Sequence, residues 1–198
     1  SDGVFALQLL RDQVRRRVYP VHRLDRPTSG VLVFAFSSET ASQLAEQFSS
    51  RRIAKTYLAV TRGTVEPKGV VDYPLQENKD APKQEAVTTY RRLSTVELGT
   101  PIPPHDTARY SLVEARPRTG RMHQVRKHLK HLSHPIIGDT AYGDSRHNRL
   151  FRNTLGVRRL LLLARRIRFD HPATGEDLAI EAPLPADMRH VFELFGWA

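Results

Sequence analysis

The sequence contains no cysteine, and this absence excludes several kinds of chemistry. Disulfide scaffolds, thiolate nucleophiles and cysteine-based zinc sites are all ruled out. No apolar run approaches the length of a membrane span, and the first residues lack the apolar stretch that a signal peptide requires. We therefore expect a soluble globular protein that works in the cytoplasm.

Acidic residues are scarce relative to basic ones. The 198 residues include 31 Lys plus Arg against 21 Asp plus Glu, which gives a formal net charge of +10, and most of the basic residues are arginine. Because arginine pairs well with phosphate, this balance favours a nucleic acid as partner. Charge alone leaves open a basic protein without any nucleic acid.

The sequence is also poor in metal-site patterns. Four histidines occur close together, at His123, His128, His131 and His134, but no Asp or Glu lies between Arg116 and Pro135. The surrounding arginines and lysines would repel a divalent ion, so we expect no metal. No Gly-x-Ser-x-Gly elbow surrounds Ser29, and the segment 138–143 lacks the Gly-Lys-Ser/Thr ending of a phosphate loop.

Apolar periodicity predicts a mixed α/β fold with mostly antiparallel pairing. A helical period runs from Val4 to Arg16, and Ser37 or Ser38 can cap a second helix. Charged or proline-rich composition predicts exposed loops over 76–83 and 100–105. Strands are predicted over 55–61, 86–93, 110–115 and 160–169, and the apolar run 31–36 also favours a strand.

A third helix is predicted after Thr119-Gly120. Its apolar stripe consists of Met122, Val125, Leu129 and Leu132. Six polar or basic residues fall largely off this stripe, namely Arg121, Gln124, Lys127, His128, Lys130 and His131. We expect this side to be exposed and to attract phosphate, although a solvated basic face is an alternative.

The most informative stretch is His22-Arg23-Leu24-Asp25-Arg26-Pro27-Thr28-Ser29-Gly30. Arg23 and Arg26 flank Asp25 and favour its ionised form, which is available as a nucleophile or general base. Pro27 fixes a backbone angle, and Gly30 permits a positive φ. The pattern predicts an active-site carboxylate on a rigid turn, whereas a surface cluster of charges is the alternative.

This motif resembles the catalytic motif of the RluA-type pseudouridine synthases. Further blocks resemble the family in the same order along most of the chain: Lys55–Val60, Arg116–Leu129, His134–Gly143 and His171–Glu176. The resemblance implies the pseudouridine synthase core, a bent, mixed and mainly antiparallel sheet with flanking helices and a central catalytic cleft. It further implies that residues 1–198 form a single catalytic domain that needs no cofactor and no metal.

The resemblance also assigns roles to residues. Asp25 becomes the catalytic carboxylate, Arg121 its guanidinium partner, and Tyr57 a ring that stacks on the target uracil, although a tyrosine among apolar strand residues is more often part of a core. Arg23 would fill the space that the flipped nucleotide leaves. The other substrate-binding candidates are His22, Arg26, Thr28, His123, Gln124 and Arg126.

Within this family the chain is most similar to members that modify tRNA, so the resemblance implies a uridine where the T stem meets the acceptor stem. A ribosomal RNA substrate and a non-catalytic RNA-binding or folding factor are alternatives. A DNA-binding protein is disfavoured because no helix-turn-helix or zinc-finger pattern is present. The chain departs from the family in two places. Leu163 stands where relatives commonly have histidine, and only 21 residues precede His22, so the usual N-terminal strand segment is missing or reduced.

Overall fold

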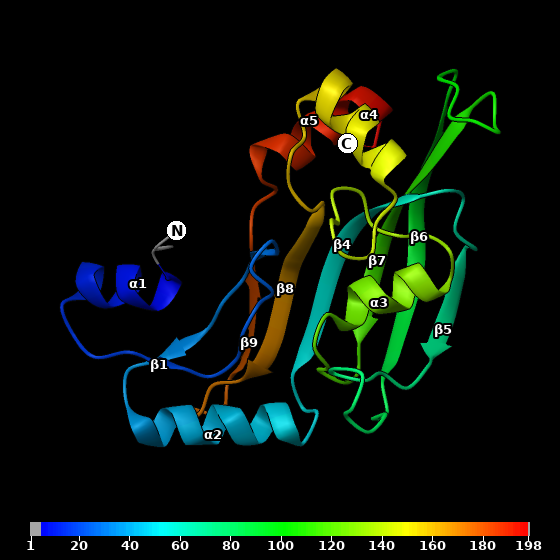
Figure 1. Cartoon of the computed structure of the whole chain (residues 1–198). Coiled ribbons are helices and arrows are strands. Elements are labelled where there is room, and N and C mark those ends of the chain that lie inside the picture. Colours follow the sequence, from blue (N-terminus) through cyan, green and yellow to red (C-terminus); the bar gives the residue numbers. More distant parts are fainter. Residues whose placement is uncertain (1–4, 198) are drawn as a thin grey trace.

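A mixed sheet forms the centre of the computed structural model, which describes residues 5–197 (Figure 1). Its main path is β2-β8-β4-β7-β6-β5, and β9 lies off this path and pairs with β8. All neighbours are antiparallel except β2 and β8, which run parallel. The strands span β2 Ser29–Gly30, β4 Ala54–Arg62, β5 Lys68–Asp72, β6 Val87–Leu98, β7 Ala108–Pro117, β8 Leu162–Asp170 and β9 Asp177–Glu181. The predicted fold class is confirmed.

Helices cover both faces of this sheet. Alternate residues of β4 and β7 point to opposite faces, so Ala59 and Val113 pack with α3 while Val60 and Leu112 pack with α4 and α5. The buried residues on each face form a separate apolar cluster. These three helices are α3 Gln124–His131, α4 Ser145–Leu155 and α5 Ala186–Phe195.

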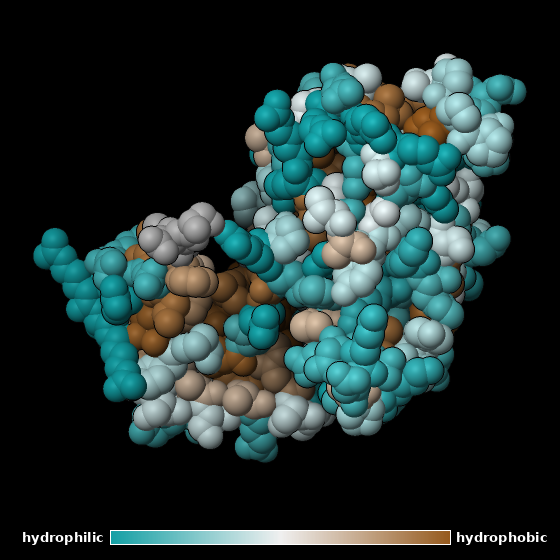
Figure 2. Space-filling model, viewed as in Figure 1, coloured by the Kyte–Doolittle hydropathy of each residue, from teal (hydrophilic) through white to brown (hydrophobic). Residues whose placement is uncertain are grey.

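The N-terminal part of the chain extends to one side of the sheet (Figure 1). It contains α1 Ala6–Val14, a short ribbon of β1 Tyr19–Pro20 with β3 Phe34–Ala35, and α2 Ser38–Ser49. Helix α2 begins after Ser37, whose hydroxyl accepts from the Thr40 amide, and this confirms the predicted cap. Figure 2 shows a hollow between this part and the main body, with hydrophobic surface on its wall.

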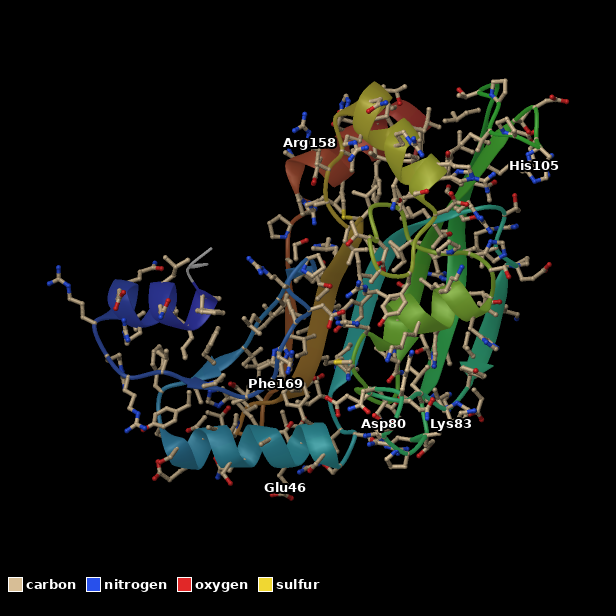
Figure 3. All side chains as sticks on the ribbon, viewed as in Figure 1. Glu46, Asp80, Lys83, His105, Arg158 and Phe169 are labelled. Atoms are coloured by element: carbon tan, nitrogen blue, oxygen red, sulfur yellow. The ribbon has the colours of Figure 1, made fainter. Side chains whose placement is uncertain are left out.

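Helix α2 closes a third apolar cluster under the end of β8. Its Leu44 packs with Ile53 and Phe169. Figure 3 shows Phe169 above α2 and Glu46 on the outward side of the same helix. The amphipathic pattern of this helix therefore joins the N-terminal part of the chain to the sheet.

The structure lengthens three of the four predicted strands, whereas the strand predicted over 160–169 begins two residues later as β8, and it adds elements that periodicity did not indicate. Helices α4 and α5 and the strands β5 and β9 were not predicted, and only residues 34–35 of the apolar run 31–36 form a strand. The first residue of the predicted helix over 4–16, Val4, lies outside the described residues. No helix within residues 5–197 has both the length and the apolar character needed to cross a bilayer.

One prediction about the third helix was wrong. His128 is fully buried, and its two ring nitrogens lie 2.9 Å from Thr88 Oγ1 and 3.0 Å from the Tyr73 carbonyl oxygen. Gln124 is also buried. The helix packs across β6 with a wider face than its apolar stripe predicts, so only part of its polar side remains exposed. Burial lowers the pKa of His128, which favours the neutral ring.

Candidate active site

Asp25 lies on a tight turn that is fixed against β8. The Thr28 amide donates to the Asp25 carbonyl oxygen at 2.8 Å, and the next residues form β2. Gly30 has a φ of 123°, and a Cβ at this position would lie 2.2 Å from the carbonyl oxygen of Ala164. Glycine is required here because both the backbone angle and the close approach exclude a side chain. The turn therefore holds Asp25 in a defined place, as the sequence predicted.

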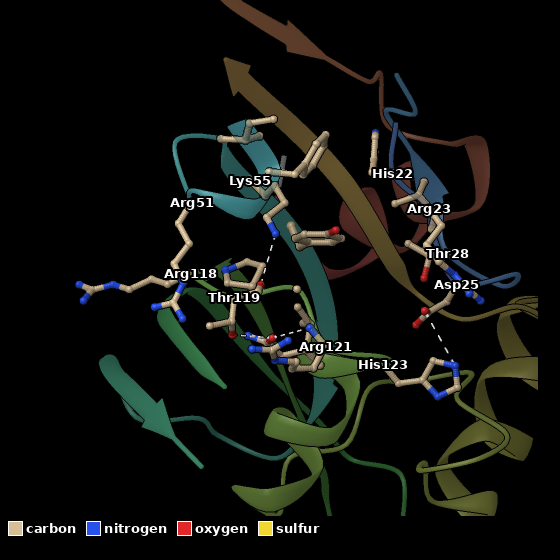
Figure 4. A pocket seen from close by; sticks show the side chains of 18 of the residues that line it. His22, Arg23, Asp25, Thr28, Arg51, Lys55, Arg118, Thr119, Arg121 and His123 are labelled. Atoms are coloured by element: carbon tan, nitrogen blue, oxygen red, sulfur yellow. Dashed lines mark hydrogen bonds and ion pairs between the residues drawn. The ribbon is translucent and has the colours of Figure 1, made fainter. Parts of the chain in front are cut away.

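The carboxylate of Asp25 faces two side chains from the start of α3. Arg126 donates from Nη1 to one carboxylate oxygen at 3.2 Å, and Nε2 of His123 lies 3.9 Å from the other (Figure 4). The Asp25 side chain keeps 21% of its surface exposed, whereas Arg126 keeps 5%. One side of the carboxylate thus contacts the protein while the rest is open to the pocket.

Arg126 is held from behind by a second carboxylate. Asp139 accepts from its Nε at 2.7 Å and from its Nη2 at 2.9 Å, and the Asp139 side chain is 1% exposed. The amides of Ala141 and Tyr142 also donate to Asp139. Burial would raise the pKa of Asp139, but these hydrogen bonds outweigh it and lower the pKa. The hydrogen bond between Arg126 and Asp139 also raises the pKa of the Arg126 guanidinium. The chain Asp139–Arg126–Asp25 is a preformed charge arrangement.

This arrangement corrects the expected partner of Asp25. The family resemblance implied Arg121 in that role, but Arg121 donates from Nε to the carbonyl oxygen of Glu85 at 3.0 Å and makes no ion pair with Asp25. Arg126, expected to bind substrate, is instead the buried partner. His123 has a φ of 57° and immediately precedes α3, and Arg126 lies in the first turn of that helix, from where its guanidinium reaches Asp25.

The site occupies a pocket of about 520 Å³ between the N-terminal turn, β4 and the start of α3. Tyr57 lines it from β4, and burial together with the nearby Asp25 raises the pKa of the Tyr57 hydroxyl to about 12. The hydroxyl therefore stays protonated at neutral pH. Lys55 lies on the same strand and donates to the carbonyl oxygen of Thr119 at 3.3 Å, and burial lowers its pKa. An aromatic ring and a carboxylate thus share one cavity.

The other predicted residues of the N-terminal motif have different surroundings. Arg23 is exposed and lines the pocket, whereas Arg26 is exposed and lies outside it. His22 accepts from the Val33 amide at 2.9 Å and stacks on Phe48, and burial, helped by Lys55, lowers its pKa to about 4. His22 therefore supports the wall of the pocket as a neutral ring. Within residues 5–197, Thr28 Oγ1 is buried without a hydrogen-bond partner and belongs to the pocket lining.

Gln124 has little capacity left for a substrate. Its carbonyl oxygen accepts from the Thr119 hydroxyl and the Arg121 amide, and its amide nitrogen donates to Thr88 and to the Val87 carbonyl oxygen. We therefore replace the expected substrate contact with a structural role that ties α3 to β6. His123, by contrast, faces Asp25 and also lies 2.8 Å from the Tyr142 hydroxyl.

Three residues of the site were not expected from the sequence. Lys55, Asp139 and Tyr142 each lie in blocks that were recognised as family-like, but no role was assigned to them. The Gly-Asp pair at 138–139 was a usable signal, because a buried carboxylate requires a cation and the third motif offers several. Residues 5–197 hold no group of three or more His, Asp or Glu side chains placed to bind a metal ion.

Leu163 occupies the position of the family histidine. It pairs with Ser29 across β2 and β8 and is 1% exposed within the apolar cluster next to α4 and α5. Its side chain is therefore part of the core on the sheet face opposite to α3, and it is not among the residues that line the pocket.

Known proteins resemble this chain in sequence over most of its length. The model of the RNA pseudouridylate synthase family matches residues 2–131. A tRNA pseudouridine synthase C from Vibrio parahaemolyticus is 47% identical over 203 residues, which cover 98% of this chain and 82% of that protein. A protein of the same name from Salmonella typhi is 47% identical and covers 100% of this chain and 80% of its own length.

Among solved structures, Human RNA Pseudouridylate Synthase Domain Containing 4 superposes with a TM-score of 0.74 at 28% identity. The match covers 96% of this chain and 80% of the human chain. The shared sequence and the shared fold lead to one conclusion. The chain belongs to the RNA pseudouridylate synthase family, of the RluA type.

Proposed function

We propose that this protein isomerises uridine to pseudouridine in tRNA, at the junction of the T stem and the acceptor stem. One observation carries the proposal. Asp25 is directed into a pocket beside Tyr57 and is held from behind by the buried pair of Arg126 and Asp139. The names of the two bacterial relatives support tRNA as the substrate.

The reaction is an isomerisation, so the substrate neither gains nor loses atoms overall. The bond between ribose C1′ and uracil N1 breaks, the ring turns, and C1′ bonds to C5, while C5 loses a proton and N1 gains one. A single carboxylate serves as nucleophile at uracil C6 or ribose C1′, or as base at C5. Each route requires the oxygens of Asp25 to face the nucleotide, and the 21% exposure of this side chain provides that access.

A uridine inside a duplex reaches this pocket only by leaving the stack. The cost is a few kcal/mol, and contacts with the RNA backbone offset it. Tyr57 offers a ring face for the extruded base, and the exposed Arg23 at the pocket rim can occupy the vacated position. We place this activity in the cytoplasm because tRNA is the substrate, and we assign it to residues 1–198 as one catalytic unit.

The test uses unmodified tRNA transcripts and a minimal RNA in which the T arm stacks on the acceptor stem. The parent protein is expected to form pseudouridine at the junction in both RNAs, as mapped by chemical sequencing. Asp25→Asn keeps the size of the side chain but lacks a carboxylate, so turnover should fall by about 10³-fold or more while RNA affinity changes little.

The outcome separates the open alternatives. Modification of ribosomal RNA fragments, with none at the tRNA junction, would overturn the substrate. Equal turnover by parent and Asp25→Asn would overturn the assigned carboxylate. Tight RNA binding without any isomerisation would favour an RNA-binding factor on the same scaffold.

A further inference from the structure

The sheet opens next to the active site. Strands β4 and β7 pair from Tyr57 and Ala115 toward the α4 end of the sheet, but no pairing continues below these residues. There β4 pairs only with β8, and the end of β7 pairs only with β6. Strands β4 and β7 therefore separate beyond Tyr57 and Ala115, and the gap between them is open to both faces of the sheet.

The face opposite to Tyr57 changes character at this opening. Toward α4 and α5 it is apolar, with Val60 and Leu112 in the core. Toward the opening the same face carries arginines, because Thr56 pairs with Arg166 and Ala54 with Arg168. Arg116 follows Ala115 and lies on the same face, since neighbouring strand residues alternate. On this face of the sheet, an arginine-rich surface therefore adjoins the apolar part that α4 and α5 cover.

These arginines line a groove of about 530 Å³. Its lining includes six arginines and Lys55 but no acidic residue: Arg51, Arg52, Arg116, Arg118, Arg166 and Arg168. The side chains of Arg116, Arg166 and Arg168 are 47 to 61% exposed, so a ligand can reach them. Their acidic partners lie outside the groove. The ion pairs of Arg166 and Arg168 are exposed on both sides, and pairs of this kind are weak enough to exchange for another anion.

The groove is continuous with the active-site pocket. Arg51, Lys55 and Arg118 belong to the lining of both. Figure 4 shows Arg51 and Arg118 on the side of the pocket away from Asp25. Arg118 makes no ion pair with any residue that the structure describes, so its guanidinium is available where the two cavities meet.

We propose that this groove binds the phosphate backbone of the RNA strand that flanks the flipped nucleotide. The inference rests on the proposed function. Guanidinium groups match phosphate oxygens, and the cavity that receives the base opens directly into the groove. The strand enters past Arg51 and Arg118 and reaches Arg166 and Arg168 on the opposite face. An acidic protein segment also matches the charge, but it has no reason to adjoin a nucleotide pocket.

The test measures the salt dependence of tRNA binding. The groove variant carries Arg116→Gln, Arg166→Gln and Arg168→Gln, and none of these residues lines the active-site pocket. Each lost phosphate contact lowers the slope of log K against log salt by about 1, so the slope should fall by about 2 to 3. At moderate salt we expect affinity to drop about 10-fold or more, with turnover at saturating RNA unchanged.

A matched control removes three exposed arginines at the far end of the molecule. Arg149→Gln, Arg152→Gln and Arg158→Gln alter α4 and the segment that follows it, where Figure 3 shows Arg158. This control should keep the parent slope. A second groove variant with Arg116→Lys, Arg166→Lys and Arg168→Lys retains the charge and should keep most of the slope, which separates charge loss from misfolding.

The proposal is overturned if the glutamine groove variant keeps the parent slope, or if the control lowers it equally. It is also overturned if the groove variant loses affinity for polyglutamate but not for tRNA. Pseudouridine formation by the parent is scored in the same samples. If the parent forms none, the proposed function fails, while the binding comparison still decides the role of the groove.

Discussion

The buried pair of Asp139 and Arg126 provides the sharpest test of how the site is built. In Asp139→Asn the new side chain can still accept from the amides of Ala141 and Tyr142, but it no longer carries a charge toward Arg126. Arg126 is 5% exposed and then lacks its main counter-ion. Removing one member of a buried ion pair costs about 3–5 kcal/mol.

This cost can be followed by thermal unfolding. For a chain of this length, 1 kcal/mol shifts Tm by about 2–4 °C, so the Tm of Asp139→Asn should fall by about 6–20 °C at pH 7. Turnover at saturating RNA should fall as well, because Arg126 also holds Asp25. Circular dichroism gives the first value, and pseudouridine mapping at a temperature where both proteins are folded gives the second.

The sign of the pH dependence follows from the pKa of Asp139. Because the folded pKa lies below its ordinary value of 3.8, the carboxylate stabilises the folded state above that pH. The difference between parent and variant should therefore be complete near pH 7 and shrink on acidification below about pH 4.

The control is Asp177→Asn, which removes the partner of Arg168 in an exposed pair of similar geometry. Its Tm should remain at the parent value, since solvent screens this pair. A Tm of Asp139→Asn within 2 °C of the parent, or a loss equal to that of Asp177→Asn, would refute the argument that burial makes the inner pair important.

Three further predictions concern the pocket. Tyr57→Phe keeps a ring for stacking and should retain at least about 10-fold more turnover than Tyr57→Leu; equal inactivity of the two would assign a role to the hydroxyl. Tyr142→Phe removes the hydrogen bond to His123 and should lower turnover about fivefold, with no added loss in a double variant with His123→Ala; additive losses would contradict the link. His22 has a folded pKa of about 4 against 6.5, so the unfolded state binds its proton first and stability falls between pH 6.5 and pH 4. Between pH 7 and pH 5 the free energy of unfolding of His22→Gln should therefore fall by about 2 kcal/mol less than that of the parent, as measured by urea unfolding at both pH values. An equal fall in both proteins would refute the buried neutral ring.

Local signals in the sequence predicted much of this protein. The turn around Asp25 follows from Pro27 and Gly30, whose backbone preferences act within a few residues. The long strands and α2 follow from apolar periodicity and from the Ser37 cap. A nucleic-acid partner was suggested by the excess of arginine. These features depend on neighbours along the chain, so one sequence is sufficient to recognise them.

The structure corrected features that depend on which face of an element meets which neighbour. Helical spacing assigned His128 and Gln124 to an exposed side, yet both are buried because α3 packs across β6 with a wide face. Helices α4 and α5 were missed because their apolar residues become a core only against the strands that they cover. Propensity carries no information about these partners.

The partner of Asp25 was also decided by tertiary structure. Arg121 and Arg126 lie five residues apart in one motif, and the resemblance assigned Arg121 to the carboxylate and Arg126 to the substrate. The left-handed backbone of His123 sets where α3 begins, and Asp139 fixes the guanidinium of Arg126 from a distant segment. Residue types and their order therefore identified the chemistry. The choice between two similar arginines required the three-dimensional path of the chain, because a charge pair depends on distance in space rather than on separation in sequence.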